Sequence, residues 1–386
     1  MTREATPVSH GTVTHGDAAS VPARESPGPG EAAAPEVAQT AIDALSARAA
    51  GENFPVALRA LPRRYRRHLM AVYRFARLVD DIGDEAPVAR AFGDGGHTRG
   101  GGGGGGGRND GDIRDIRDTR GGGGERDARD DGGDGTGASR PGRQHQAVAA
   151  NRLRLLDLVE QDLDRAFSPG AAAGLPVVKD LGRTAAECAI PAEPFRMLIQ
   201  ANRQDQTVSR YDSFDALLGY CRMSANPVGH TVLHIFGMAT PERMRLSDLV
   251  CTALQLAEHW QDVAEDFARD RIYLPRDDMA AFGCTEGDVA DAANATRRAA
   301  QPMVPPRLRE LLRSETERAR RLLDEGAALT GTLHGWARLA VAGYVAGGRA
   351  TLTAIAASDF DVFSTTPRPG RAATVTGLAR AYVTGR

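Results

Sequence analysis

The sequence of 386 residues has few cysteines and no N-terminal apolar segment of the kind found in exported proteins. Its four cysteines are far apart in the chain, form no CxxC pair and have no plausible set of histidine ligands nearby. Neither a disulfide framework nor a zinc site is therefore indicated. Residues 1–35 lack a continuous apolar run, so no secretory signal is predicted. The simplest setting for this chain is the reducing cytoplasm.

Lysine and long apolar runs are also scarce. Lys179 is the only lysine among 48 basic residues, which fits the codon bias of a GC-rich genome as well as an arginine-specific role. The longest apolar stretch, residues 336–357, is interrupted by Arg338 and Arg349. We expect this stretch to fall short of a membrane span.

Glycine is abundant in one segment only. Residues 93–142 hold 21 of the 44 glycines, together with 8 arginines and 10 acidic residues, so the rest of the chain balances 40 basic against 40 acidic side chains. This balance argues against a protein that binds polyanions. Two RGG triplets resemble RNA-binding tails, but the segment is net acidic and has no aromatic residue beyond Phe92 at its edge. Nucleic acid is therefore not an expected partner.

These composition shifts predict the domain organisation. Residues 1–46 lack sustained apolar periodicity, and residues 93–143 have almost no apolar side chains, so both segments should be disordered. A single domain should cover residues 47–370, interrupted by the 93–143 insertion. Residues 371–386 are interpreted as a C-terminal tail.

The remaining sequence has the apolar period of helices and lacks the alternation of strands, which predicts an all-α fold built as one large domain. The expected helices are residues 63–84, 147–166, 192–206, 214–223, 226–237, 246–267, 307–329 and 336–358.

Two acidic clusters are the strongest sign of chemistry. Asp80 and Asp84 are four residues apart at the end of the first helix, and Asp262 and Asp266 have the same spacing in a later one. Each pair therefore lies on one helical face, where like charges repel. Mg²⁺ would relieve that repulsion, since it prefers one or two carboxylates together with substrate phosphates. A solvated helix face is the simpler explanation for a single pair.

The neighbours of the carboxylates favour a pocket over a solvated face. Tyr73 and Arg77 share the helical face of the first pair. Gln255 and Glu258 share the face of the second. A mixture of aromatic, cationic, amide and carboxylate groups is typical of a pocket lining.

Four segments resemble the squalene/phytoene synthase family of head-to-head prenyl synthases, in the order found in that family. They are residues 53–57 (NFPVA), 71–84 (AVYRFARLVDDIGD), 220–229 (YCRMSANPVG) and 254–266 (LQLAEHWQDVAED). The resemblance runs from about residue 50 to about residue 370, apart from the insertion. Within the family, the forms ENFPVA, SANPVG and WQDVAEDFARDRIYLP are most similar to the hopanoid-pathway hydroxysqualene synthases.

The resemblance implies an isoprenoid synthase fold with a central active-site cavity, and a role for each matching residue. Mg²⁺ and the diphosphate would be bound by Asp80, Asp84, Asp262 and Asp266. Arg77 and Arg271 would lie near the diphosphate, Phe54 would line the prenyl channel, and Tyr73, Tyr220, Gln255, Tyr273 and Tyr344 would line the pocket, the tyrosines Tyr73, Tyr220 and Tyr344 being catalytic candidates.

The implied reaction is conversion of presqualene diphosphate and water to hydroxysqualene, with release of diphosphate. No nicotinamide site is evident, which agrees with water as the terminator. Alternatives are condensation of two prenyl diphosphates to presqualene diphosphate, squalene or phytoene, or an inactive homologue acting as a helical scaffold. The expected partners are the prenyl diphosphate, other enzymes of the hopanoid pathway and the inner face of the membrane.

One residue departs from the family pattern. Glu258 stands where the family usually has Asn, four residues before Asp262. Three interpretations remain open: an additional Mg²⁺ ligand, a carboxylate neutralised by His259 or an arginine, or a change that weakens activity.

Overall fold

The computed structural model describes residues 61–84, 140–297, 304–368 and 370–385. Within these ranges the regular structure is helical, and the one β-type contact is an isolated bridge between Arg210 and Ile272. The expected all-α class is confirmed. Phe54 and the segments expected to be disordered, residues 1–46 and most of 93–143, lie outside the described residues.

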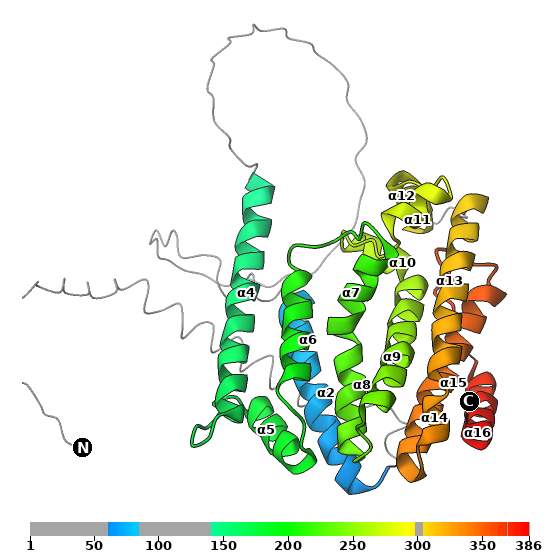
Figure 1. Ribbon diagram of the computed structural model, residues 1–386. Helices are drawn as coiled ribbons and strands as arrows, with labels where there is room; N and C mark the ends of the chain where they lie inside the picture. The colour runs from blue at the N-terminus through cyan, green and yellow to red at the C-terminus, as the bar shows by residue number, and fades with distance from the viewer. Residues whose placement is uncertain (1–60, 85–139, 298–303, 369, 386) are drawn as a thin grey trace, which may run out of the picture.

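The helices are those drawn in Figure 1. They are α2 (Arg63–Asp84), α4 (Arg140–Phe167), α5 (Pro176–Cys188), α6 (Glu193–Gln204), α7 (Phe214–Ser224), α8 (Asn226–Ile235), α9 (Pro241–Gln261), α10 (Val263–Ala268), α11 (Arg276–Ala281), α12 (Glu286–Arg297), α13 (Pro306–Gly326), α14 (Leu329–Thr332), α15 (Gly335–Ala357) and α16 (Arg371–Thr384). The long helices run lengthwise through the molecule, and the short α10, α11 and α12 gather at one end (Figure 1).

The amphipathic pattern of α2 explains its central place. Phe75, Leu78, Val79 and Ile82 are fully buried, and their spacing of three and four residues puts them on one side of the helix. α2 packs against α4, α5, α6 and α8. Its predicted bounds, residues 63–84, are confirmed.

A second group of helices packs around α9. The most extensive helix pairs are α9 with α13 and α15 with α16, and α9 also contacts α15. Glycine permits the close approach of α15 and α9, because a side chain at Gly348 would lie 2.6 Å from Leu254 Cδ2. Trp260, near the end of α9, is the largest fully buried side chain.

Three sequence predictions need correction. The helix expected over residues 246–267 is broken at Asp262, whose backbone (φ −107°, ψ 17°) separates α9 from α10. The apolar pattern continues on both sides of this single residue, so it could not reveal the break. The presumed C-terminal tail contains α16, which packs along α15. The last residues assigned to the insertion, from Arg140 on, belong to α4.

α15 also differs from its expectation. Among the described helices it alone is long and apolar enough, by length and composition, to cross a membrane. Arg338 and Arg349 do not lower its mean hydropathy below that of membrane spans. In the structure α15 packs against α9, α13, α14 and α16, which is how a core helix of a bundle is placed.

A buried carboxylate joins α13 to its surroundings. Glu315 is fully buried, and Arg318 donates hydrogen bonds to it at 3.2 Å and to Asp278 of α11 at 2.8 Å. The same guanidinium lies 4.1 Å above the ring of Phe214. Burial raises the pKa of Glu315 to about 8, although Arg318 opposes the change. The side chain therefore stays protonated in the folded protein at neutral pH.

This raised pKa predicts a pH-dependent stability. Between pH about 4.5 and about 8 the unfolded chain loses the Glu315 proton while the native state retains it, so stability falls as pH rises. In Glu315→Gln this contribution should be absent, making the variant more stable than wild type at pH 8 by on the order of 3 kcal/mol. Chemical denaturation at pH 5 and pH 8 tests this; an equal pH dependence in both proteins would contradict it.

Candidate active site

The first acidic cluster ends α2. Carboxylates at a helix C-terminus are unfavourable, because the negative end of the helix dipole lies there, and α2 has no basic residue in its last turn. Arg77 Nε lies 3.1 Å from Asp81 Oδ1, and Asp81 is buried. Arg77, predicted to bind substrate, thus pairs with the middle carboxylate of the cluster.

Asp80 is held by α6. Asn202 Nδ2 donates a hydrogen bond to Asp80 Oδ1 at 3.1 Å. A side chain at Gly83 would lie 2.2 Å from Asn202 Oδ1, so glycine is required for this close contact between α2 and α6. The sequence DDIGD therefore provides two exposed carboxylates and the space for the amide that orients one of them.

The second cluster lies at the break between α9 and α10. Asp262 separates the two helices, and its carbonyl accepts a hydrogen bond from the Asp266 backbone N–H at 2.8 Å. Because Asp262 leaves the helical conformation, the shared face predicted for Gln255, Glu258 and the two aspartates is not continuous. The two carboxylates remain one short turn apart.

Arg271 connects the two clusters. Its Nη1 forms an ion pair with Asp84 Oδ1 at 2.8 Å, and its backbone N–H donates to the Asp266 carbonyl at 2.9 Å. The backbone N–H of the next residue, Ile272, donates a hydrogen bond to the Ser209 carbonyl at 3.0 Å. This bond holds the chain around Arg271 against the loop between α6 and α7. Arg271 thus contacts both acidic clusters, and its predicted place near a diphosphate stays a prediction.

The carboxylates have raised pKa values. Desolvation raises the pKa of Asp80 to about 6, partly opposed by Asn202 and increased by Asp84. Desolvation and then the nearby Asp262 raise the pKa of Asp266 to about 7. For Glu258 the pKa is raised by desolvation, Asp262 and Asp80 in that order. Asp80 on α2 and Glu258 on α9 therefore lie close enough to repel each other across the space between the helices.

A cavity lies beside these groups. It has a volume of about 350 Å³ and is lined by Leu254, Ala257, Glu258, Gln261, Asp262, Gly343, Tyr344, Gly347, Gly348 and Thr351 of α9, α15 and the residue between α9 and α10. Tyr344 is 40% exposed, yet desolvation raises the pKa of its hydroxyl. Glu258 lines the same cavity and is likewise exposed, and desolvation raises the pKa of its carboxyl as well.

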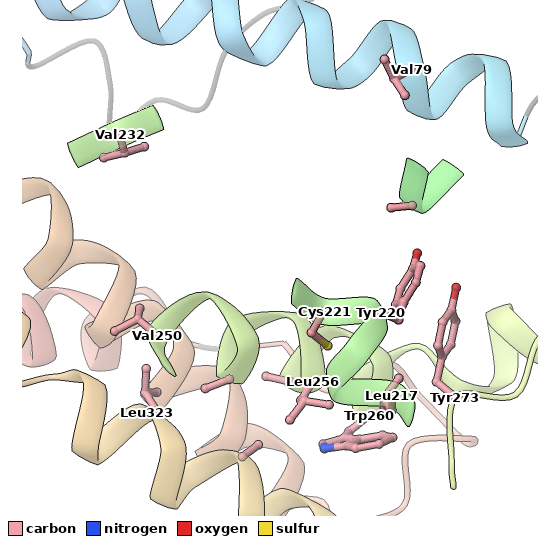
Figure 2. Packing of buried hydrophobic residues seen from close by; sticks show 14 of the residues in the cluster. Val79, Leu217, Tyr220, Cys221, Val232, Val250, Leu256, Trp260, Tyr273 and Leu323 are labelled. Carbon is pink, nitrogen blue, oxygen red and sulfur yellow. The ribbon is translucent and has the colours of Figure 1, made fainter. Parts of the chain in front are cut away.

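Aromatic side chains gather next to the Arg271 segment. Tyr273 stacks on His259 with 3.6 Å between ring centroids, and it also contacts Tyr211 and Tyr220 at 5.7 and 5.9 Å. Tyr220 and Tyr273 lie side by side with their hydroxyl groups pointing the same way (Figure 2). The Tyr220 hydroxyl donates to Asp205 Oδ2 at 2.9 Å.

The contacts of His259 decide one interpretation of Glu258. Burial lowers the pKa of His259 to about 3, and Arg271 adds to the effect. The imidazole is therefore neutral at physiological pH and does not neutralise Glu258. No arginine in the described ranges forms an ion pair with Glu258 either. The carboxylate faces the cavity without a cationic partner, which leaves the interpretations of a metal ligand and of weakened activity.

The predicted site residues do not all lie together in the structure. Asp80, Asp84, Asp262, Asp266, Arg271, Tyr220 and Tyr273 lie around one end of the bundle, and Tyr344 lines the adjoining cavity. Gln255 points to His259, with 3.2 Å between Nε2 atoms. Tyr73 is half-buried on α2 and is not among the residues lining the 350 Å³ cavity.

Sequence reasoning missed three supporting residues. Asp205 and Asn202 come from the end of α6, and Arg152 of α4 lies near Asp84 and Arg271. Asp205 Oδ1 is buried without a hydrogen-bond partner, and burial raises the pKa of this carboxyl to about 6. These residues stand alone in the sequence, outside any motif, so only their packing reveals them.

The donor atoms fit a hard divalent cation. They are carboxylate oxygens whose raised pKa values reflect desolvation and unrelieved like charge, and a cation would stabilise their ionised forms. No group of three or more metal-ligating side chains is assembled within the described ranges. Mg²⁺ is typically bound by one or two carboxylates, with water and substrate phosphate completing its coordination.

Comparison with known proteins identifies the family. The profile of the squalene/phytoene synthase family matches residues 47–92 and 130–376, more than half of the chain. The protein belongs to this family, whose members are enzymes that use prenyl diphosphates in isoprenoid biosynthesis.

Individual relatives are consistent with this assignment. A hydroxysqualene synthase from Sinorhizobium fredii is 27% identical over 72% of this chain and 70% of its own length. One from Zymomonas mobilis is 44% identical, but over 24% of this chain and only 31% of its own length. The crystal structure of squalene synthase HpnC from Alicyclobacillus acidocaldarius matches 85% of this chain and 96% of that protein, with 34% identity and a TM-score of 0.57. A dehydrosqualene synthase structure with 18% identity and a TM-score of 0.59 supports the fold alone.

The burial of His259 makes a direct prediction. Because the pKa of its imidazole is lowered to about 3, the ring should stay neutral from pH 8 down to pH 5. Its NMR chemical shifts, assigned by comparison with His259→Gln, should therefore be constant over this range. A midpoint near pH 6.5 would contradict the stacked, desolvated position described for this side chain.

Proposed function

We propose that the protein is a Mg²⁺-dependent synthase that converts presqualene diphosphate and water to hydroxysqualene and diphosphate. The observation that carries the proposal is Arg271, which joins two carboxylate clusters beside a cavity edged by tyrosine. Hydroxysqualene synthases among the relatives support the choice of reaction.

The charged residues provide the diphosphate site. Asp80, Asp84, Asp262 and Asp266 would bind Mg²⁺, which neutralises the charge of a leaving diphosphate when it is bound. Arg271 has planar N–H groups suited to phosphate oxygens, and its present partner, Asp84, is a surface carboxylate that a phosphate can replace. Leaving-group charge is thereby stabilised at one end of the cavity.

The aromatic residues suit the opposite charge. Loss of diphosphate leaves a carbocation, which ring faces stabilise without forming a bond to it. Tyr220 and Tyr273 provide such ring faces. The Tyr220 hydroxyl donates a hydrogen bond to Asp205, which orients the phenol oxygen toward that carboxylate. Glu258 is one of several polar groups on the cavity wall, with Gln261 and Thr351, beside which water can be held. Capture of the cation by that water forms the C–O bond and releases one proton.

A second candidate reaction is condensation of two prenyl diphosphates, to presqualene diphosphate, squalene or phytoene. It is favoured by a phytoene synthase of Arthrospira platensis, 32% identical over 56% of this chain and 71% of that protein. An inactive scaffold has Glu258 as its only support.

The reaction is tested by product analysis. Purified protein incubated with presqualene diphosphate and Mg²⁺, without NADPH, should release diphosphate and yield hydroxysqualene identified by mass spectrometry. Parallel incubations with farnesyl and geranylgeranyl diphosphate separate the condensation reactions. Recovery of unreacted presqualene diphosphate from folded protein would contradict the proposal.

The metal site is tested by Asp80→Asn and Asp266→Asn. Each variant removes a carboxylate predicted to bind Mg²⁺, so turnover should fall about 10²- to 10⁴-fold at fixed Mg²⁺ and recover in part as Mg²⁺ is raised. Asp270→Asn is the matched control, because Asp270 is 88% exposed, pairs with Arg210 and has a positive φ that Asn tolerates. Equal activities in all three variants would exclude a catalytic metal at these positions.

The guanidinium is tested by Arg271→Gln. Loss of charged hydrogen bonds to the diphosphate should lower kcat/KM about 10- to 100-fold. Arg276→Gln removes an arginine that pairs with the exposed Asp212 and should have little effect. If the two variants behave alike, Arg271 does not hold the diphosphate.

A further inference from the structure

A second pocket lies between α2 and α5. It has a volume of about 250 Å³ and is lined by Arg67, Ala71, Arg74, Asp180, Arg183, Thr184 and Glu187. Arg74 is six residues before Asp80, which places it about 120° around α2 from that carboxylate. None of the residues that line this second pocket belongs to the predicted active site.

The charges of this pocket do not balance. Arg67 pairs with Glu187 at 2.5 Å, and Arg183 pairs with Asp180 at 3.0 Å. These two ion pairs use both carboxylates of the lining. Arg74 has no hydrogen bond or ion pair with any described residue, so one positive charge is left in excess.

Arg74 is also the most constrained of the three arginines. The side chains of Arg67 and Arg183 are 63% and 72% exposed, so water can solvate them. Arg74 is half-buried, and its Nε is fully buried without a hydrogen-bond partner. A buried N–H without an acceptor is unfavourable, and an oxygen ligand inside the pocket would satisfy it.

The chemistry of the pocket points to a phosphate. A guanidinium binds phosphate oxygens through two parallel N–H groups. The Thr184 hydroxyl on α5, whose oxygen lies 3.1 Å from His68 Nδ1, adds a polar group to the lining. The neighbouring start of α2 contains Arg63, Arg64, Arg66 and Arg67 and no acidic residue in its first turn, which makes this end of the helix positive.

We propose that the pocket between α2 and α5 binds a phosphate group, with Arg74 as its principal ligand. The same chemistry is presented by a soluble phosphate and by a phosphate monoester in a lipid headgroup. This site is independent of the proposed reaction, since it lies on a different face of α2.

The test uses the full-length protein in Mg²⁺-free buffer with EDTA. Inorganic phosphate is titrated by calorimetry, and binding to vesicles containing phosphatidic acid is compared with binding to phosphatidylcholine vesicles. Arg74→Gln should weaken at least one of these interactions about tenfold or more, and Arg74→Lys should weaken it less. Circular dichroism and thermal melting confirm that each variant is folded.

Two controls locate the effect. Arg245→Gln and Arg276→Gln each remove an exposed arginine that lies on another helix and pairs with a surface carboxylate, Glu325 and Asp212 respectively; both should bind like wild type. Loss in the phosphate titration identifies a soluble ligand, and loss confined to phosphatidic acid vesicles identifies a lipid headgroup. If folded Arg74→Gln equals wild type in both measurements, or if Arg245→Gln or Arg276→Gln weakens binding as much as Arg74→Gln does, the proposal is overturned.

Discussion

The active end of this protein depends on repulsion between carboxylates that the fold forces together. Asp80 of α2 is close enough to raise the pKa of Glu258 on α9, and Asp262 raises the pKa of Asp266 in the same way. Such an arrangement costs stability, and α2 places its acids at the unfavourable end of a helix dipole. An arrangement that costs stability and is supported by a buried core is expected at a functional site.

Arg271 limits this cost in the free protein. It pairs with Asp84 while its backbone is bonded to Asp266, so one residue holds both clusters at a fixed separation. The aromatic group formed by Tyr211, Tyr220, Tyr273 and His259 packs beside it and stays uncharged, because burial keeps the imidazole neutral. Negative charge, a cationic clamp and neutral ring faces are thus in adjacent positions, as ionisation of a prenyl diphosphate requires.

Much of this was accessible from the sequence, for identifiable reasons. The apolar period defined α2 to the residue, and spacing alone put Asp80 and Asp84 on one face. The break at Asp262 escaped detection because a single non-helical residue leaves the apolar period intact. α16 escaped because its pattern is weakly amphipathic, and its helix is stabilised by packing on α15. Asn202, Asp205 and the stacking of His259 on Tyr273 depend on tertiary contacts that no local pattern contains.

We propose that both acidic clusters bind the same Mg²⁺–diphosphate group. A double-mutant cycle of Asp80→Asn and Asp266→Asn tests it most directly, with the free energy of Mg²⁺-dependent binding of a non-ionising prenyl thiolodiphosphate as the readout. If the clusters share one ligand, the two changes should couple by about 1 kcal/mol or more. Additivity within about 0.5 kcal/mol would show that the clusters act independently and would contradict the account.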